Sequence, residues 1–368
     1  MDAPAPDVAS APVFTSLPPL SLYVHLPWCV RKCPYCDFNS YEARGPLADR
    51  HYVDALLLDL RSELPYVQGR FVQSVFIGGG TPSLFSGPAI ERLLRGVADA
   101  LPLAADVEIT LEANPGAVEA ERFAAFRRAG VNRLSIGIQS LRDDRLRALG
   151  RVHDSREAVH AVQVARNAGF DNLNLDFMYG LPKDDVEGAL ADLSRGIELG
   201  PAHLSWYQLT LEPNTAFERR PPALPGDDVV AEIERRGRAL LDSAGYVRYE
   251  ISAYSQPGRT CVHNSNYWQF GDYLGLGAGA HGKVTLPAEN AIERRAKTRN
   301  PRTYLETAGG AACTAQRLER AREIAVEFLL NALRLTGGVP LRLFVERTGL
   351  PAAMLAGPRR EAVDRGWL

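Results

Sequence analysis

Short apolar segments alternate with amphipathic segments between residues 21 and 212 of this 368-residue chain. The apolar segments predict strands, because they are short and end at glycine, proline or a polar residue. The predicted strands are residues 22–27, 74–77, 107–115, 133–140, 172–180 and 203–210. Apolar residues at helical spacing predict helices between them. These are residues 49–64, 88–100, a segment ending at Gly130, 156–168 and 186–199.

Strand, loop and helix recur about every thirty residues, which favours a parallel sheet made of βαβ units. Six such units are too few for a closed eight-stranded barrel. We therefore expect an α/β fold, a partial and open (β/α)6 barrel. Binding and catalytic residues of such folds lie at the C-terminal ends of the strands.

The pattern divides the chain into four parts. Residues 1–20 are rich in Pro and Ala and predict a disordered lead-in, and residues 21–212 form the partial barrel. Residues 213–300 connect it, through a Pro-rich crossover, a helix at 227–245 and a strand at 246–255, to the final part. Residues 301–368 predict a smaller, mainly helical C-terminal domain that is only partly completed at Leu368.

Three thiols follow the first predicted strand within eight residues, at Cys29, Cys33 and Cys36. Thiolates are ligands of iron–sulfur clusters and of structural zinc. A structural zinc site needs four ligands, often in two separated pairs, so His25 or His51 would have to complete it. Three ligands on a four-iron cluster leave one iron open to a substrate. The spacing favours the cluster over a zinc-stabilised barrel that only binds a partner.

Polar residues and glycines also stand where predicted strands end. Residues 78–80 are glycines followed by Thr81, and glycine lets a ligand approach the backbone closely. This turn lacks the spacing and the Lys of a phosphate-binding loop, and a tight βα turn is the alternative. Glu112, Gln139 and Asp176 end three successive strands, where a buried carboxylate needs a partner or a ligand.

Two further features complete the candidate chemistry. Arg151 lies in the loop after the fourth strand, where it could meet a carboxylate. His263 stands near Cys261 and Trp268, and imidazole is the commonest axial ligand of haem iron. A His followed by aromatic residues is more often structural, so the residues alone leave both roles of His263 open.

Composition limits the function classes. Hydrophobic residues make up 46% of the chain and the net charge is −2, which gives no argument for nucleic-acid binding. Five cysteines do not form a disulfide framework, and a thiolate cluster suits a reducing cytoplasm. No stretch reaches the ~20 apolar residues of a membrane span. The first residues carry no Lys or Arg and no apolar core, unlike a secretory signal. We expect a cytoplasmic protein.

The spacing C-x3-C-x2-C after a strand resembles the radical S-adenosylmethionine (SAM) superfamily. Residues 22–41, 78–82, 111–115, 134–140 and 175–182 together resemble the oxygen-independent coproporphyrinogen III oxidase family, in order and over nearly the whole chain. The resemblance implies a radical SAM barrel with a 4Fe–4S cluster on Cys29, Cys33 and Cys36. It implies SAM contacts at Tyr23, Tyr35, Gly79, Gly80, Thr81, Glu112, Gln139, Arg151 and Asp176.

Two branches of that family differ at one cysteine. The oxidase branch, which decarboxylates two propionates of coproporphyrinogen III, has a further cysteine two residues after the third, and Phe38 stands there in this chain. The heme-chaperone branch has an H-N-x-x-Y-W motif, which residues 263–268 match. This resemblance implies haem binding with His263 as the preferred contact. The oxidase stays the alternative, so enzyme activity is left open and no catalytic residue is assigned.

The heme-chaperone branch implies haem as cargo and haem-accepting respiratory proteins as partners. It is compatible with association with a membrane surface through those partners and with a homodimer, and no nucleic-acid partner is expected. That branch usually continues through a small helical domain with a further helix or strand. Because this chain stops at Leu368, either the protein is naturally short or the sequence is incomplete.

Overall fold

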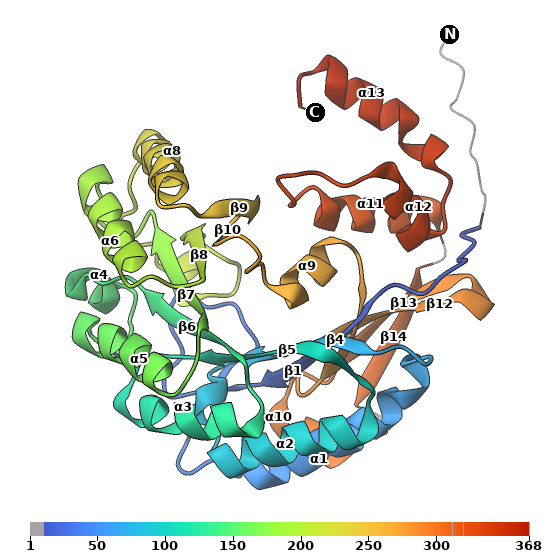
Figure 1. The fold of residues 1–368 in the computed structure, drawn as a ribbon, viewed down its shortest axis with the longest axis horizontal. Helices are drawn as coiled ribbons and strands as arrows, with labels where there is room; N and C mark the ends of the chain where they lie inside the picture. The colour runs from blue at the N-terminus through green and yellow to red at the C-terminus, as the bar shows by residue number, and fades with distance from the viewer. Residues whose placement is uncertain (1–10, 311, 319, 368) are drawn as a thin grey trace.

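The computed structural model describes residues 11–310, 312–318 and 320–367. One curved sheet of twelve strands organises this part of the chain (Figure 1). Its strands are β1 (Leu20–Leu26), β4 (Val72–Gly79), β5 (Leu103–Ala113), β6 (Arg133–Gln139), β7 (Asn172–Tyr179), β8 (His203–Gln208), β9 (Val247–Glu250), β10 (Ala253–Ser255), β11 (Asp272–Leu276), β12 (His281–Leu286), β13 (Ala291–Lys297) and β14 (Cys313–Leu318). A separate pair is formed by β2 (Trp28–Cys29) and β3 (Tyr41–Glu42).

The strand order is β14-β13-β12-β11-β1-β4-β5-β6-β7-β8-β10-β9. The run from β11 to β8 is parallel, and antiparallel strands extend it at both ends. The helices are α1 (Asp49–Glu63), α2 (Gly87–Ala100), α3 (Ala117–Ala129), α4 (Asp143–Ala148), α5 (Ser155–Asn167), α6 (Val186–Glu198), α7 (Ala216–Arg219), α8 (Asp227–Ser243), α9 (Val262–Trp268), α10 (Pro301–Thr307), α11 (Ala321–Ala332), α12 (Leu341–Thr348) and α13 (Ala356–Asp364).

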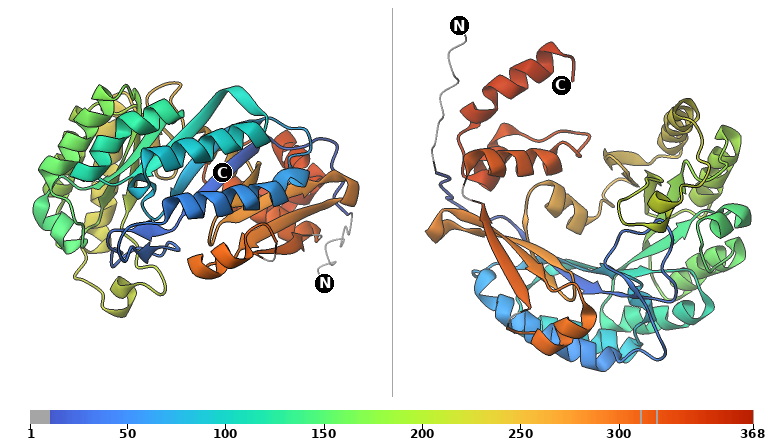
Figure 2. Two further views of the ribbon diagram at one scale, coloured as in Figure 1. Left: turned by 90° about the horizontal axis from the view of Figure 1, so that it is seen from below. Right: turned by 180° about the vertical axis from the view of Figure 1, so that it is seen from behind.

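Helices α1, α2, α3, α5 and α6 lie along the outside of the curved sheet, whereas α9 lies within its curve (Figures 1 and 2). Successive side chains of a strand point to opposite faces. In β5, Leu111 is buried in the main core with Phe123 and Phe126 of α3, while the neighbouring Glu112 lines a cavity on the other face. The outer face is therefore apolar and helix-covered, and the inner face is left for polar residues.

The structure confirms the expected partial barrel of parallel βα units. Strands β11 to β14 were not expected. For β11 and the start of β12 the reason is that residues 271–282 are glycine-rich and show no clear alternation. Strand β11 pairs with β1, which would otherwise be an open sheet edge. The single strand expected at 246–255 is instead the antiparallel pair β9 and β10.

The C-terminal part combines helices with one strand. Its helices α11, α12 and α13 agree with the mainly helical expectation, but β14 pairs with β13 and belongs to the sheet. The domain boundaries at 213 and 301 stay predictions. Within the described residues, no helix has both the length and the apolar composition that crossing a membrane needs.

The described part of the expected lead-in, residues 11–20, is packed and not free. The N–H of Val13 donates to the carbonyl oxygen of Gly349 at 2.9 Å, and Phe14 is buried in a core cluster with Phe328 and Phe344. An apolar ring in a Pro- and Ala-rich stretch leaves water when a groove between helices can receive it. Residues 1–10 of the lead-in lie outside the described residues.

A close contact between α8 and β8 generates a stability prediction. A Cβ added at Gly237 would lie 2.0 Å from Trp206 Cη2, inside a packed core. Gly237→Ala should lower the free energy of unfolding by about 1–3 kcal/mol, because overpacking outweighs the ~1 kcal/mol gain in helix propensity. Chemical denaturation measures this. Gly357→Ala in α13 is the control, since no described heavy atom lies within 4 Å of that Cβ. Equal stability of the two variants would contradict the prediction.

Candidate functional site

A cavity of about 570 Å³ opens where the parallel strands end. The last residues of these strands lie around the cavity, because the C-terminal ends of parallel strands lie at the same edge of a sheet. The cavity brings together most of the residues expected from the sequence: Cys29, Cys33, Tyr35, Cys36, Gly79, Gly80, Thr81, Glu112, Gln139, Arg151 and Asp176. Tyr23 and His263 are not part of its wall.

The cysteine loop is held by the small β2–β3 pair. Cys29 pairs with Glu42, and the N–H of Cys36 donates to the carbonyl oxygen of Cys33 at 3.2 Å. All three thiols are partly exposed and form no disulfide. Burial raises the pKa of the Cys29 and Cys36 thiols. Both are therefore protonated at neutral pH when no metal is bound, and a metal must displace their protons.

The geometry disfavours zinc on this loop. His25 uses both ring nitrogens, one with the Tyr23 hydroxyl and one with the Asn39 carbonyl oxygen, each at 2.9 Å. His51 lies exposed on α1. Among the described residues, no three His, Cys, Asp or Glu side chains converge on one ion. A tetrahedral zinc needs such convergence, with sulfurs at about 2.3 Å from the metal, whereas a cluster spreads its ligands over separate irons.

The glycine turn packs against the strand that leads into the cysteine loop. Gly79 has φ +117°, and a Cβ at Gly80 would lie 2.6 Å from the carbonyl oxygen of Trp28. The N–H groups of Gly80 and Thr81 donate to Leu26 and Trp28, at 2.8 and 2.7 Å. These N–H groups are used inside the protein and are not available to a ligand.

A chain of hydrogen bonds links this turn to the cysteines. Asn114 donates to Thr81 Oγ1 at 2.8 Å, and Arg151 Nη2 donates to Asn114 Oδ1 at 2.6 Å. Arg151 Nη1 lies 3.6 Å from Cys33 Sγ. The chain places positive charge beside one thiol sulfur and fixes the side chain that carries it. Sequence analysis did not single out Asn114, although it follows Ala113 directly at the end of its strand.

Two carboxyl groups share the inner wall of the cavity. The N–H of Gly79 donates to Glu112 Oε2 at 3.0 Å, and Asn174 Nδ2 donates to Asp176 Oδ1 at 2.8 Å. Burial, and then the nearby Asp176 carboxylate, raises the pKa of Glu112 to about 7. Burial also raises the pKa of Asp176. Carboxylates in such a site favour a cationic ligand, which would offset their desolvation.

The wall continues on β8 with residues that sequence analysis missed. The Tyr207 hydroxyl donates to Gln139 Oε1 at 2.8 Å, and Gln139 has a left-handed φ of +67°. Ser205 donates to Asn174 Oδ1 at 3.1 Å. These positions alternate with buried apolar residues along β7 and β8. That alternation was the signal in the sequence, but only strand ends were considered.

His263 lies on α9 and packs against the inner face of the sheet. Its Nδ1 lies 3.1 Å from Ser74 Oγ, and its ring centroid lies 5.0 Å from that of Phe76. Ser74 Oγ donates its own proton to Ser21 Oγ at 2.8 Å, so Nδ1 of His263 carries the hydrogen and Ser74 accepts it. Burial, followed by the charge of Arg133, lowers the pKa of His263 to about 3. The imidazole is neutral at physiological pH.

The cavity contacts the same helix on another side. Asn264 and Trp268, one helical turn apart, line the cavity. Cys261 is fully buried, and its Sγ lies 3.4 Å from Glu108 Oε1 as a donor. Burial raises the pKa of Cys261 to about 12. Cys261 is therefore a protonated thiol, and it lies outside the cavity wall that the cysteine loop lines.

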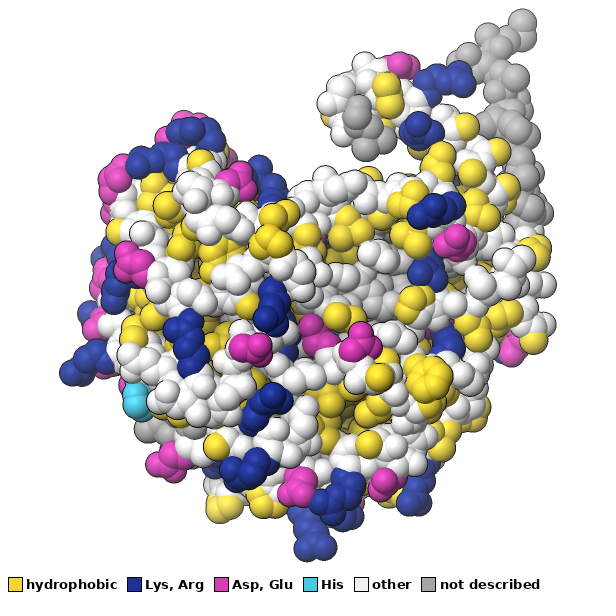
Figure 3. All heavy atoms as spheres, viewed as in Figure 1, with side chains coloured by type: hydrophobic (Ala, Val, Ile, Leu, Met, Phe, Trp, Pro, Cys, Tyr) yellow, Lys and Arg dark blue, Asp and Glu magenta, His cyan; other side chains and the backbone are white. Residues whose placement is uncertain are grey.

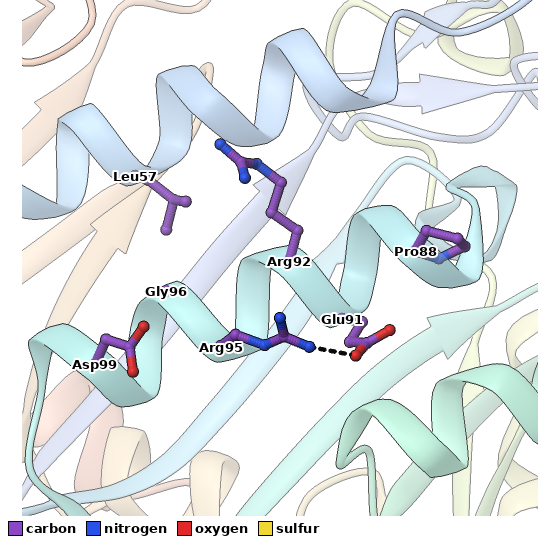
Figure 4. A pocket seen from close by; sticks show the side chains of 7 residues that line it. All are labelled: Leu57, Pro88, Glu91, Arg92, Arg95, Gly96 and Asp99. Atoms are coloured by element: carbon purple, nitrogen blue, oxygen red, sulfur yellow. Dashed lines mark hydrogen bonds and ion pairs between the residues drawn. The ribbon is translucent and has the colours of Figure 1, made fainter.

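A second cavity, of about 320 Å³, lies between α1 and α2 (Figure 4). Two of its basic residues are in ion pairs at the surface: Arg95 with Glu91, as Figure 4 shows, and Arg92 with Asp54 of α1. No reactive or ligating constellation is therefore left there among the described residues. Acidic and basic side chains are interspersed over the face shown in Figure 3, so that face has no extended patch of one charge.

The chain is similar to proteins of known family along most of its length. It is 53% identical to "Heme chaperone HemW" of Escherichia coli (strain K12) over 352 residues, 96% of this chain and 92% of that protein. The chain belongs to the HemW family. A HemW of Haemophilus influenzae is 47% identical over 356 residues, again covering 96% of this chain and 92% of that protein.

Two further comparisons agree with this membership. Residues 23–193 match the model of the radical SAM superfamily. The solved structure of coproporphyrinogen III oxidase (HemN) from Escherichia coli, described as a radical SAM enzyme, superposes with a TM-score of 0.78 at 25% identity, over 94% of this chain and 84% of that one. Membership in the radical SAM superfamily implies a 4Fe–4S cluster and SAM as cofactors of this HemW-family chain.

The cavity fits both cofactors. A sulfonium and an ammonium group need negative partners, which Glu112 and Asp176 could supply, and a cluster needs deprotonable thiols at one rim, which the cysteine loop could supply.

The raised pKa of Glu112 predicts a pH dependence. Above pH 7 this carboxyl group is ionised and attracts cationic SAM, and the attraction is lost as pH falls through 7. Between pH 8 and pH 6, SAM affinity of the cluster-loaded protein should fall more steeply in the wild type than in Glu112→Gln. At pH 8 the variant should bind about ten-fold more weakly. Equilibrium dialysis measures this.

The control for this prediction is Glu198→Gln, which removes an exposed carboxylate at the end of α6 and should behave as the wild type. Protonation changes of free SAM between pH 6 and pH 8 affect its binding to all three proteins equally, so they cancel when the pH profiles are compared. An identical pH profile for Glu112→Gln and the wild type would remove Glu112 from the SAM site.

Proposed function

We propose that this protein binds haem and transfers it to respiratory or other haem proteins, while carrying a 4Fe–4S cluster and SAM at the rim of its barrel. The 53% identity to the HemW heme chaperone over 96% of the chain carries this proposal. Phe38 also supports it, because the position that holds a fourth cysteine in the oxidase branch is here an exposed phenyl ring. A cytoplasmic location, a homodimer and association with a membrane surface through haem-accepting partners stay predictions.

The proposed cluster ligands are Cys29, Cys33 and Cys36. A cluster held by three thiolates supplies one iron with an open coordination position. The residues proposed to hold SAM beside it are Tyr23, Tyr35, Gly79, Gly80, Thr81, Glu112, Gln139, Arg151 and Asp176. Eleven of these twelve residues line one cavity, and Tyr23 lies outside its wall, stacked on Phe76.

His263 is the proposed haem ligand. An axial imidazole must be neutral, and a hydrogen bond from one ring nitrogen leaves the other nitrogen as the donor to iron. Because Nδ1–H donates to Ser74, the lone pair stands on Nε2, which contacts no hydrogen-bonding partner among the described residues. His263 is 9% exposed, so iron reaches Nε2 only after side chains around α9 move aside.

Haemin titration tests the haem proposal. The wild-type protein should give a shifted Soret band that saturates, and His263→Ala should lose the shift or bind at least about ten-fold more weakly, because the axial ligand is gone. His160→Ala removes an exposed imidazole on α5 and is the matched control.

Two outcomes would reject the chaperone proposal. One is the absence of a Soret shift in the wild type together with unchanged behaviour of His263→Ala. The other is formation of protoporphyrinogen in an anaerobic assay with reductant, SAM and coproporphyrinogen III, which would favour the oxidase alternative.

Substitution of the cysteines tests the cluster assignment. Serine at Cys29, Cys33 or Cys36 should abolish the brown absorbance of the anaerobically reconstituted protein, because each thiolate holds one iron. Serine at Cys261 or Cys313 should leave that absorbance intact. Iron and sulfide analysis gives the stoichiometry, and full iron content in any variant of the triplet would contradict the assignment. Zinc without iron would indicate the zinc-stabilised alternative.

A further inference from the structure

Trp268 and Arg334 meet at the wall of the main cavity, although they come from different parts of the chain. Trp268 ends α9 and Arg334 follows α11, and these two helices lie beside each other in Figure 1. The guanidinium carbon of Arg334 lies 4.3 Å from the centroid of the Trp268 ring. Both residues line the cavity. Stacking of this kind orients the planar guanidinium and holds its N–H groups in one plane.

Each of the two side chains has a buried donor without an acceptor. Trp268 Nε1 and Arg334 Nε make no hydrogen bond to any described residue. An unmade hydrogen bond of a buried donor costs about 1–3 kcal/mol, so such donors are rare and need an explanation. Both residues line the cavity, and although these two nitrogens are themselves covered, a turn of either side chain toward the cavity would let a ligand oxygen accept from them.

The charge of Arg334 is only partly matched. Its Nη2 donates to Glu250 Oε2 at 3.1 Å, and the other oxygen of Glu250 accepts the N–H of Ser252 at 3.1 Å. A guanidinium has five N–H groups in a planar fork that suits a carboxylate. Of the other arginines on the cavity, Arg31 is exposed, and Arg151 has an unpaired Nε as well but donates from Nη2 to Asn114 and the Gly137 carbonyl oxygen. On the α9 side of the cavity, Arg334 is thus the arginine that has a buried donor without an acceptor.

We propose that Arg334 and Trp268 bind a propionate carboxylate of the haem cargo, so that α9 and the C-terminal part hold the macrocycle together. This rests on the proposed haem-binding function. Propionates lie at the edge of the macrocycle, away from the iron, and are ionised at neutral pH. Trp268 stands five residues after His263, about 7.5 Å along the helix axis and about 140° around it, so the iron ligand and the carboxylate contact lie on different sides of one short helix. The methionine carboxylate of SAM has the same chemistry and is the competing source.

The test compares haemin with haemin dimethyl ester, in which both carboxylates are blocked. Wild-type protein should bind haemin about ten-fold more tightly than the ester, as expected for a charge-assisted hydrogen bond. Arg334→Gln should bind the ester as the wild type does and lose most of the preference for haemin. Arg322→Gln, which removes an exposed positive charge from α11, should keep the full preference. SAM affinity should be the same in all three proteins.

Several results would overturn the inference. If Arg334→Gln keeps the preference for haemin, Arg334 does not bind a propionate. If it loses SAM affinity instead, the subsite belongs to the carboxylate of SAM. If the wild type binds haemin and the ester equally, haem binding stands and the propionate subsite is rejected. If the wild type binds neither porphyrin, the proposed function itself fails.

Arg334→Gln also loses the ion pair with Glu250, and this loss could unfold the variant. Two further variants keep the test decisive in that case. Arg334→Lys retains the charge but not the fork, and should keep a reduced preference for haemin. Trp268→Phe retains an aromatic ring but removes the indole N–H, and should lower the preference several-fold without changing the affinity for the ester. Full preference in both variants, with thermal unfolding like that of the wild type, would overturn the inference.

Discussion

The packing of helices against one face of the curved sheet is the constraint on which the rest of the structure depends. Val24, Ile77 and Leu111 are fully buried in the main core between the sheet and its outer helices. Burial of apolar area at roughly 25 cal/mol per Å² makes this face the principal source of stability. Because side chains alternate along each strand, the inner face does not have to supply the core. It can therefore hold polar residues that bind ligands.

The polar inner face is stable only where its groups find partners. Asn174 is the centre of one such network, with contacts to Ser135, Asp176 and His203, the last at 2.6 Å. In a low-dielectric interior a fully paired network is rigid, and an unpaired group is costly. The exceptions in the described chain include Trp268 Nε1 and Arg334 Nε, which lie on residues of the cavity wall. Unpaired buried atoms also occur away from the cavity, for example at Ser83 and Thr110, so only those on cavity residues can be related to a ligand.

An open barrel suits a large cargo better than a closed one. Eight closed strands leave an interior that side chains fill. Here β11 covers the edge of β1 and β10 covers the edge of β8, so the sheet has no bare edge at either end of its parallel run. The space within the curve is taken by α9 instead, whose residues contact both the sheet and the cavity. A short helix seated on a polar face can shift more easily than a strand of the sheet, because it has no ladder of hydrogen bonds to neighbours.

Local periodicity and chain order were enough to predict the βα repeats, the parallel run and the common edge that holds Glu112, Gln139, Asp176 and the cysteine loop. These features follow from short-range patterns, because parallel strands in series always present their C-terminal ends together. Asn114 bound to Arg151, strand β11 beside β1, Phe14 under the C-terminal helices and Arg334 over Trp268 were decided only by the tertiary structure. Each of these contacts joins segments that are far apart in sequence. The local sequence around one partner does not predict which residue the other partner is. Such contacts depend on the strand edges, grooves and hydrogen-bond donors that are still open after the sheet and its helices have packed.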